Sequence, residues 1–249
     1  MDVEKLLNTI MQAGTMLIES GAEINRVEDT MVRMCKTYEE VEYADSYVTL
    51  TGIMFSLTVN NETKTRISRV HTGEVNLDRI DKINSLSRRA SIEHLSVDEL
   101  AFQLNTIQND SRYSFLATTF FGAVGAAGFA LFFDGTLLEI GICFFVGILI
   151  RCITALCARY KLSSFLNNAV SAGLAVLVIM WIHILCPSTN TEVMIISSFM
   201  LLVPGLAITN AIRDTVAGDY ISGLARAADA FLCAVAIAVG AGFILYFWV

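Results

Sequence analysis

Residues 137–158 read LLEIGICFFVGILIRCITALCA, an apolar run in which the only charged residues are Glu139 and Arg151. As a helix rising about 1.5 Å per residue, this run is long enough to cross the roughly 30 Å hydrocarbon core of a membrane. Four further apolar segments of similar length accompany it, so the sequence predicts five transmembrane helices. Their expected bounds are 114–133, 137–158, 169–186, 193–209 and 230–249.

Positive charge flanks these segments on one side only. The basic residues beside alternate ends are Arg112, Arg159, Lys161, Arg213 and Arg226. The loops at the opposite ends carry only Asp134, Glu139 and Glu192. By the positive-inside rule, we expect residues 1–110 to be cytoplasmic and Val249 to lie outside a multi-pass plasma (cell inner) membrane protein.

The charged residues divide the chain into two parts. Residues 1–110 hold 11 Lys and Arg and 18 Asp and Glu, whereas residues 111–249 hold only 6 and 6. We therefore predict an acidic cytoplasmic domain at 1–110 and a transmembrane domain in the lipid bilayer at 111–249. Because the net charge of −7 belongs to the soluble part, a nucleic-acid partner is not expected.

Hydrophobic periodicity predicts an α+β fold for the first domain. Apolar residues recur at helical spacing from Leu6 to Ile18 and from Ile24 to Tyr38. Residues 43–70 are β-branched and aromatic, with a hairpin turn expected at Asn60-Asn61. Two further helices are expected after residue 76, the second of them with a capping box from Ser96 to Glu99. The whole chain is thus predicted to be an α-helical integral membrane protein with an N-terminal cytoplasmic α+β domain.

The turn between the first two helices reads ESGAEINRVED from Glu19 to Asp29. It has two interpretations: a regulatory or ligand-binding corner, or a helix start that favours acidic residues on a solvated face. The candidate residues of this corner are Glu19, Gly21, Glu23, Arg26 and Glu28.

The stretch from Leu202 to Asp229 is the most informative for function. Pro204 removes a backbone donor within the fourth span and Gly205 loosens the next position, so a broken helix is expected here. Such breaks form substrate and ion sites in secondary transporters, although a simple kink followed by a polar loop is the alternative. The polar candidates beyond the break are Asn210, Arg213, Asp214, Gly218, Asp219, Arg226 and Asp229, the last as a candidate proton carrier.

Two further polar residues are candidates for the pathway. Arg151 lies well inside a span, where a guanidinium requires either a carboxylate in the protein or an anionic substrate. Asn167, near the start of the third span, is either a helix-start signal or part of a cytoplasmic gate. No CxxC pair or other metal-ligand spacing occurs, so no metal and no cofactor are expected.

The chain resembles the threonine/serine exporter (ThrE-like) family, and more closely its split form, in which a larger YjjP-type subunit works with a small YjjB-type membrane subunit. The resemblance rests on these segments in this order: Glu19 to Asp29, TGIMFS from Thr51, Pro204-Gly205, NAIRD from Asn210, GDYISG from Gly218, and Arg226. It implies export of threonine or serine, or in the split form of a dicarboxylate such as succinate, driven by the proton gradient. It also implies a YjjB-type partner, with a homo-oligomer of identical halves as the alternative.

Three functions compete on the sequence alone. The leading hypothesis is a subunit of a secondary exporter. The second is a membrane-anchored sensor or assembly protein that acts through its cytoplasmic domain. A membrane enzyme is the weakest, because the sequence shows no nucleophile and base pair, no metal spacing and no phosphate-binding loop.

Overall fold

The computed structural model describes residues 1–71, 73, 75–110 and 113–248, so Arg112 and Val249 of the charge pattern lie outside the described residues. The chain divides into two compact units, which are described separately. The first unit comprises Met1–Ser111 together with Ile208–Ala227, and the second comprises Arg112–Ala207 together with Ala228–Val249. Residues 208–227, which the sequence analysis placed with the transmembrane part, therefore pack with the N-terminal part of the chain. The division into a cytoplasmic and a transmembrane domain stays a prediction.

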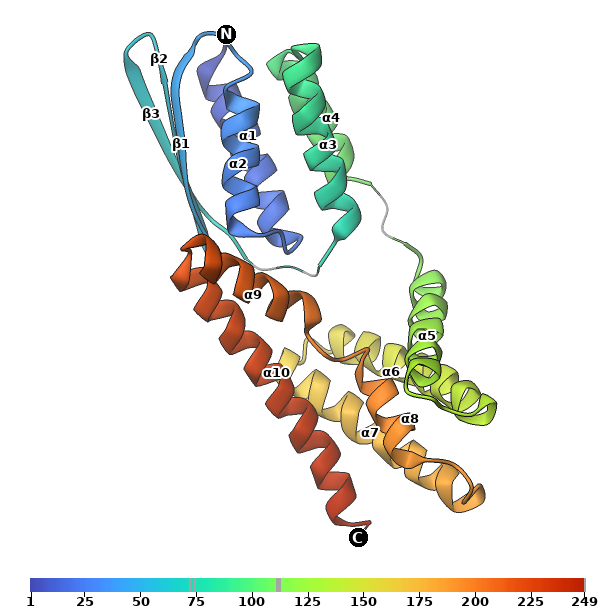
Figure 1. Cartoon of the computed structure of the whole chain (residues 1–249). Coiled ribbons are helices and arrows are strands. Elements are labelled where there is room, and N and C mark those ends of the chain that lie inside the picture. Colours follow the sequence, from blue (N-terminus) through green and yellow to red (C-terminus); the bar gives the residue numbers. More distant parts are fainter. Residues whose placement is uncertain (72, 74, 111–112, 249) are drawn as a thin grey trace. The chain divides into compact units, whose positions relative to one another are not determined.

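The first unit has three layers (Figure 1). The antiparallel sheet β1-β2-β3 forms one layer, with strands at Val41–Thr49, Gly52–Val59 and Glu62–Arg69. Helices α1 (Val3–Glu19) and α2 (Ile24–Cys35) cover one face of the sheet, and α3 (Leu77–Glu93) and α4 (Val97–Gln108) pack on α1 and α2. Alternate residues of β2 point into this core, including Ile53, Phe55 and Leu57, because side chains of a strand alternate between its two faces.

The hairpin turn and the capping box of this unit lie where the sequence predicted them. Asn60 and Asn61 both have positive φ, at 51° and 64°, and they connect β2 to β3 with Val59 opposite Glu62. Two such residues form the type of tight turn that matches strand twist, as expected from the Asn-Asn pair. The capping box between Ser96 and Glu99 at the start of α4 is also present.

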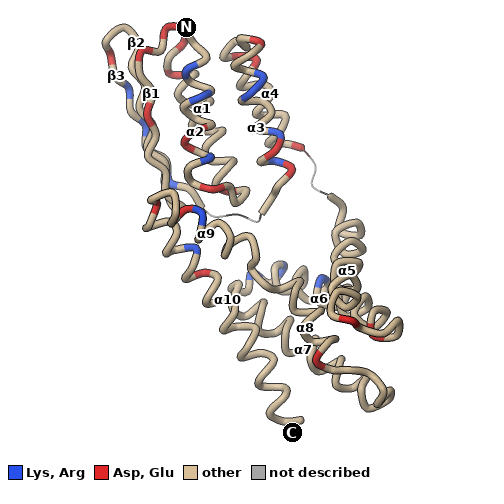
Figure 2. Tube along the Cα trace, viewed as in Figure 1, with Lys and Arg blue, Asp and Glu red and all other residues tan. Residues whose placement is uncertain are grey.

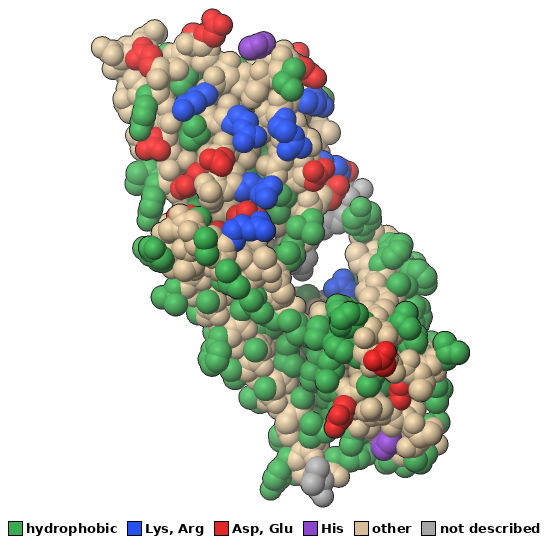
Figure 3. Space-filling model, in the orientation of Figure 1, with side chains coloured by type: hydrophobic (Ala, Val, Ile, Leu, Met, Phe, Trp, Pro, Cys, Tyr) green, Lys and Arg blue, Asp and Glu red, His purple; other side chains and the backbone are tan. Residues whose placement is uncertain are grey.

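The second unit contains long apolar helices. Within the described residues, four helices are long and apolar enough to cross a membrane: α5 (Phe115–Phe132), α6 (Leu137–Arg159), α7 (Ser164–Leu185) and α10 (Tyr220–Tyr246). Few charged residues lie along them (Figure 2), and apolar side chains cover their visible surface (Figure 3). An apolar exterior is what contact with lipid requires.

The fourth expected span, 193–209, is not one helix. Helix α8 (Thr191–Phe199) ends after 9 residues, the chain is non-helical from Met200 to Pro204, and α9 (Gly205–Ala217) then begins. The expected bounds of this helix were therefore wrong, whereas the break expected near Pro204 is present. The count of five spans stays a prediction. Proline has no backbone N–H and disfavours a helical conformation in the residue before it, so α8 cannot continue into α9.

Two other helices start earlier than expected. Helix α7 begins at Ser164 and not at 169, because the Ser163 side chain accepts a hydrogen bond from the Leu166 N–H and caps the helix. Helix α10 begins at Tyr220 and not at 230. The expected bounds counted apolar residues only, so they omitted the polar first turns of both helices.

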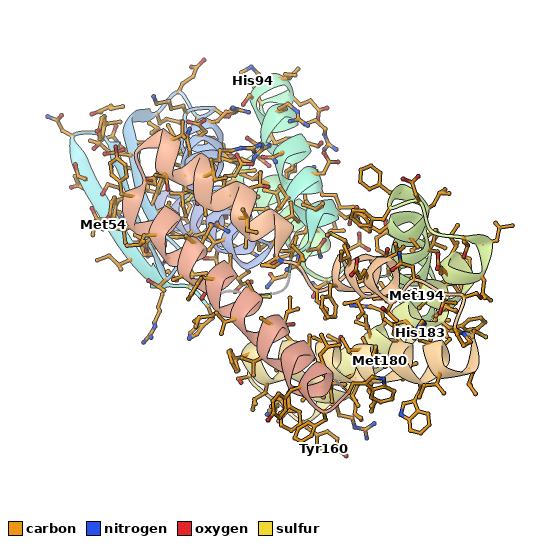
Figure 4. All side chains as sticks on the ribbon, turned by 60° about the horizontal axis from the view of Figure 1, so that its bottom comes forward. Met54, His94, Tyr160, Met180, His183 and Met194 are labelled. Atoms are coloured by element: carbon orange, nitrogen blue, oxygen red, sulfur yellow. The ribbon has the colours of Figure 1, made fainter. Side chains whose placement is uncertain are left out.

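Small residues allow close packing between the helices of the second unit. A Cβ atom on Gly147 of α6 would lie 2.9 Å from the Cα of Ala123 on α5. Helix α8 packs against α5, α6 and α7, and its Met194 is fully buried. Figure 4 labels Met194 together with Met180 and His183 of α7. Close packing of this kind is a main source of helix association in lipid.

Gly240 of α10 allows the closest of these approaches, and its replacement tests the packing. A Cβ atom there would lie 1.9 Å from the carbonyl oxygen of Ala169 on α7, whereas a Cβ on Gly242 would meet nothing within 4 Å. We expect Gly240→Ala to lower the free energy of unfolding by about 1–3 kcal/mol through overpacking. Gly242→Ala, the matched control, should leave it unchanged. Thermal unfolding of the purified protein in detergent measures both, and equal melting temperatures for the two variants would contradict the packing.

Candidate functional site

The turn between α1 and α2 leaves backbone groups that these helices do not satisfy. Helix α1 ends at Glu19, the chain reverses through Gly21, whose φ is +84°, and α2 begins at Ile24. The Gly21 and Ala22 N–H groups bond to carbonyls of α1, but the Gly21 and Ala22 carbonyls and the Ile24 N–H point elsewhere. Glu23, at the N-cap position of α2, makes no side-chain capping bond. Buried backbone groups of this kind require partners from another segment.

Side chains of α9 and α10 supply these partners. The Asn210 amide donates to the Gly21 carbonyl at 3.0 Å, and the Arg226 guanidinium donates to the Ala22 carbonyl at 2.6 Å. The Asp214 carboxylate accepts from the Ile24 N–H at 3.1 Å and so caps α2 in place of Glu23. A carboxylate at the N-terminus of a helix is also favoured by the helix dipole. We refer to Asn210, Asp214 and Arg226 with the turn they hold, residues 21–24, as the α9–α10 clasp.

A buried ion pair lies at the centre of the clasp. The Arg226 Nε donates to the Asp214 Oδ2 at 2.8 Å, and the exposed fractions of the two residues are 9% and 1%. Burial raises the pKa of the Asp214 carboxyl, while the Ile24 N–H and the Arg226 guanidinium oppose that rise. Each carboxylate oxygen has a partner, as a buried charge requires.

Two exposed arginines and the partly buried Glu23 surround this pair. Glu23 forms ion pairs with Arg213 of α9 and, at 3.5 Å, with Arg26 of its own helix. The Arg213 and Arg26 side chains are 54% and 45% exposed. Water screens pairs of this kind, so each contributes little to stability. Arg213 therefore forms an exposed ion pair and Arg226 a buried one, although nothing in the sequence distinguishes the two arginines.

Two glycines shape the corner at which α9 turns into α10. Gly218 has a φ of +99°, and the next residue, Asp219, donates its N–H to the Asp214 carbonyl at 2.8 Å. A Cβ atom on Gly223 would lie 2.2 Å from the Thr215 Oγ1 and 3.0 Å from the Ala211 carbonyl oxygen. The corner accordingly depends on glycine at both places.

Glu28, in α2, has a strongly perturbed carboxyl group. Its Oε1 accepts a hydrogen bond from the Val48 N–H of β1 at 2.9 Å. Burial, with smaller contributions from Asp219, Asp45 and Asp29, raises its pKa to about 7, although the Val48 hydrogen bond opposes this. Glu28 therefore changes its charge near neutral pH.

The structure brings some of the predicted site residues together and leaves others apart. The clasp and its surroundings contain Gly21, Glu23, Arg26, Asn210, Arg213, Asp214, Gly218, Asp219 and Arg226. Glu19 is the last residue of α1, and its carbonyl oxygen would lie 2.6 Å from a Cβ atom on Gly73. Pro204 and Gly205 mark the start of α9. Arg151, Asn167 and Asp229 belong to the second unit. Asn167 there accepts a hydrogen bond from the Ser171 hydroxyl at 3.4 Å, and Asp229 is exposed.

The sequence analysis did not predict that the Glu19–Asp29 corner and the Asn210–Arg226 stretch meet. The groups of the turn that make these contacts are mostly backbone atoms. The types of side chain in the sequence do not show which backbone atoms need a partner. The available signal was complementary charge, because an acidic turn and a segment with two arginines occur in one chain. In the described part of the chain, no group of three or more His, Cys, Asp or Glu side chains is placed to hold a metal ion.

The protein-family model with the description "Putative threonine/serine exporter" (ThrE) matches residues 8–248, nearly the whole chain. The chain belongs to this family. Members of the threonine/serine exporter family are transporters, and the apolar helices of this chain agree with a multi-pass membrane protein. Comparison with curated proteins and with solved structures found no match.

In this member of the threonine/serine exporter family, the two arginines of α9 and α10 should differ sharply in their effect on stability. Arg226→Gln leaves the Asp214 carboxylate buried without its cation, so we expect the free energy of unfolding to fall by about 3–5 kcal/mol. Arg213→Gln, the matched control, removes an exposed pair and should cost less than about 1 kcal/mol. Thermal unfolding in detergent compares the two, and a similar loss for both variants would rule out the buried pair as the main contributor.

Glu28 should make the stability of this exporter-family protein depend on pH. Its pKa is about 7 in the folded state against a usual value of 4.5, so the folded state binds the proton more tightly. The resulting stabilisation is fully present below pH 4.5 and is lost as the pH rises through 7. We expect Glu28→Gln, which keeps an acceptor for Val48, to match the wild type at pH 4 and to melt at a higher temperature at pH 8. The exposed Glu40→Gln is the control, and parallel pH profiles for wild type and Glu28→Gln would refute the shift.

Proposed function

We propose that this chain is one subunit of a secondary exporter for small metabolites that carry a carboxylate. The observation that supports this most directly is the helix break from Met200 to Pro204, in a membrane protein of the threonine/serine exporter family. Non-helical backbone at membrane depth is tolerated only where it is buried in protein or lines a water-filled cavity. Broken helices of this kind provide substrate and ion sites in secondary transporters.

The break bears on the number of membrane crossings. The 9 residues of α8 rise by only about 14 Å, less than a hydrocarbon core about 30 Å thick. The residues that follow form turns, in which the Leu202 and Val203 N–H groups donate to the Phe199 carbonyl at 2.8 and 3.0 Å. We propose that α8 and these turns form a shortened fifth crossing that returns the chain to the cytoplasmic side, so that residues 1–110 are cytoplasmic and the C-terminus lies outside, as the positive charges indicate.

The clasp gives the N-terminal domain a role in transport. Its side chains come from α9, which follows the break, and from the first turns of α10, which continues as a membrane-length helix. A movement at the break would therefore pull on the α1–α2 turn, and the state of that turn would affect the break in return. We propose that the cytoplasmic domain controls the transport pathway through this connection.

Proton coupling is assigned to Asp229. It follows Arg226 by three residues on α10, where a carboxylate near hydrocarbon requires a specific function. Within the described residues it has no ion-pair partner, so no fixed salt bridge accounts for its charge.

Substrate and partner follow from the family. Threonine and serine are the first candidates, and a dicarboxylate such as succinate is the second. Many large apolar residues of α10 are exposed, including Phe231, Leu232 and Val239. We propose that they face lipid and a small membrane subunit of the YjjB type, with a homo-oligomer as the alternative.

Efflux measurements test this function. Cells loaded with labelled threonine, serine or succinate should export at least one of them faster when they express the chain with its small membrane partner. Asp229→Asn should reduce export at least tenfold, as expected for loss of a proton carrier, while insertion into the membrane is kept. Asp134→Asn, which removes an exposed carboxylate from a loop, is the matched control.

A sensor or assembly protein would behave differently from an exporter. It would tolerate both Asp229→Asn and Arg213→Ala without any change in efflux. No gain in efflux for any of the three compounds, with or without the partner, would reject the exporter function.

A further inference from the structure

Arg151 lies near a close approach of helices α5 and α6. It follows Gly147, the residue of α6 that contacts Ala123, by one helical turn. Its side chain runs over Gly122 of α5, since a Cβ atom there would lie 3.3 Å from the Arg151 Cγ and 3.4 Å from its Cδ. A larger residue at position 122 would displace the guanidinium. The absence of a side chain on Gly122 thus makes room for the arginine.

The guanidinium of Arg151 has no partner in the described part of the chain. Its Nε is buried and makes no hydrogen bond, and no ion pair involves the residue. The neighbouring Thr154 hydroxyl donates to the Ile150 carbonyl at 2.6 Å. Arg151 is therefore a cation in an apolar helix with unsatisfied hydrogen-bond donors.

The acidic residues of the second unit do not supply the missing anion. Glu139, on the same helix, lies 12 residues earlier, about 18 Å along the helix axis. Its oxygens accept from the Thr136 N–H at 2.7 Å and the Asn190 N–H at 2.5 Å, where the carboxylate joins two loops. Asp134 and Glu192 lie in or beside those same loops, at the far end of α6 from its C-terminus. The remaining acidic residue of this unit, Asp229 on α10, forms no ion pair with any described residue.

A charge at such a site is stable only with a counter-ion. Arginine inside a transmembrane helix costs energy unless an anion or water solvates it, and its planar group binds carboxylates through two parallel hydrogen bonds. We propose that Arg151 binds the carboxylate group of the transported molecule. This inference rests on the proposed export function and deepens it, because it assigns the anion-binding residue of the pathway.

The same carboxylate chemistry could come from a partner chain. A fixed carboxylate would hold Arg151 in every state of transport, whereas a substrate carboxylate occupies it only during turnover. Competition by a substrate analogue separates the two sources. L-threoninol is the probe, because it differs from L-threonine only in having a CH2OH group in place of the carboxylate.

The experiment measures transport of labelled L-threonine by the full chain with its membrane partner in proteoliposomes. In the wild type, unlabelled threonine should compete and threoninol should not. Arg151→Gln should raise KM at least tenfold with a smaller effect on kcat, and threonine and threoninol should become equal competitors. Arg159→Gln, which removes a charge from the exposed end of the same helix, should keep the wild-type KM and the wild-type selectivity.

Two further variants keep the test decisive if Arg151→Gln fails to insert. Arg151→Lys keeps the charge but loses the paired geometry, and Gly122→Val keeps the arginine but displaces it, so both should raise KM severalfold. Wild-type KM and wild-type selectivity in any inserted variant of Arg151 would overturn the inference and leave the export function intact. Weaker assembly with the partner at unchanged selectivity would assign Arg151 to a fixed ion pair instead, and this too would overturn it. Absence of export of threonine, serine and succinate alike by the wild type would overturn the proposed function and this inference together.

Discussion

The Asp214 carboxylate holds together two parts of the chain that are almost 200 residues apart in sequence. One oxygen caps the N-terminus of α2, and the other accepts a hydrogen bond from the Arg226 guanidinium. The same guanidinium also donates to the Ala22 carbonyl. Both charges are buried, so each depends on the other and on the backbone of the turn. Because of this mutual dependence, residues 208–227 pack with the N-terminal part of the chain. The turn between α1 and α2 has all of its hydrogen bonds only when α9 and α10 are in place.

The second unit obeys a different constraint. In lipid each backbone N–H and C=O must be satisfied within the protein, which favours uninterrupted helices. Helices α5, α6 and α7 meet this requirement along their whole length, and small residues such as Gly147 and Gly240 bring them and α10 together. The stretch from Met200 to Pro204 departs from the rule, and so does the Arg151 guanidinium, which has no partner in the part of the chain that the structure describes. Departures of this kind occur where a protein handles polar molecules, and they lead to the pathway proposed here.

The local structure was largely predictable from the sequence. Hydrophobic periodicity located α1 and α2, the Asn60-Asn61 pair located the hairpin, and apolar length located α5 and α6 within about one residue. The break near Pro204 was also expected, since proline acts on its own helix. Its extent was not, because α8 stops at Phe199, five residues before the proline. A helix that ends inside a membrane leaves backbone carbonyls without partners in that helix. The position of the end therefore depends on the hydrogen-bond donors that the rest of the folded protein provides.

The candidate site was predictable only as a set of residues. Charge and spacing singled out Glu23, Arg213, Asp214 and Arg226, but no pattern distinguished the buried Arg226 from the exposed Arg213. The sequence by itself determined the membrane-length helices, the acidic first part and the identity of the polar residues, because these properties depend on neighbours along the chain. Only the tertiary structure decided that Asp214 caps α2, that Arg226 is its counter-ion and that Arg151 has none among the described residues. Those outcomes depend on which groups approach within hydrogen-bond distance after folding.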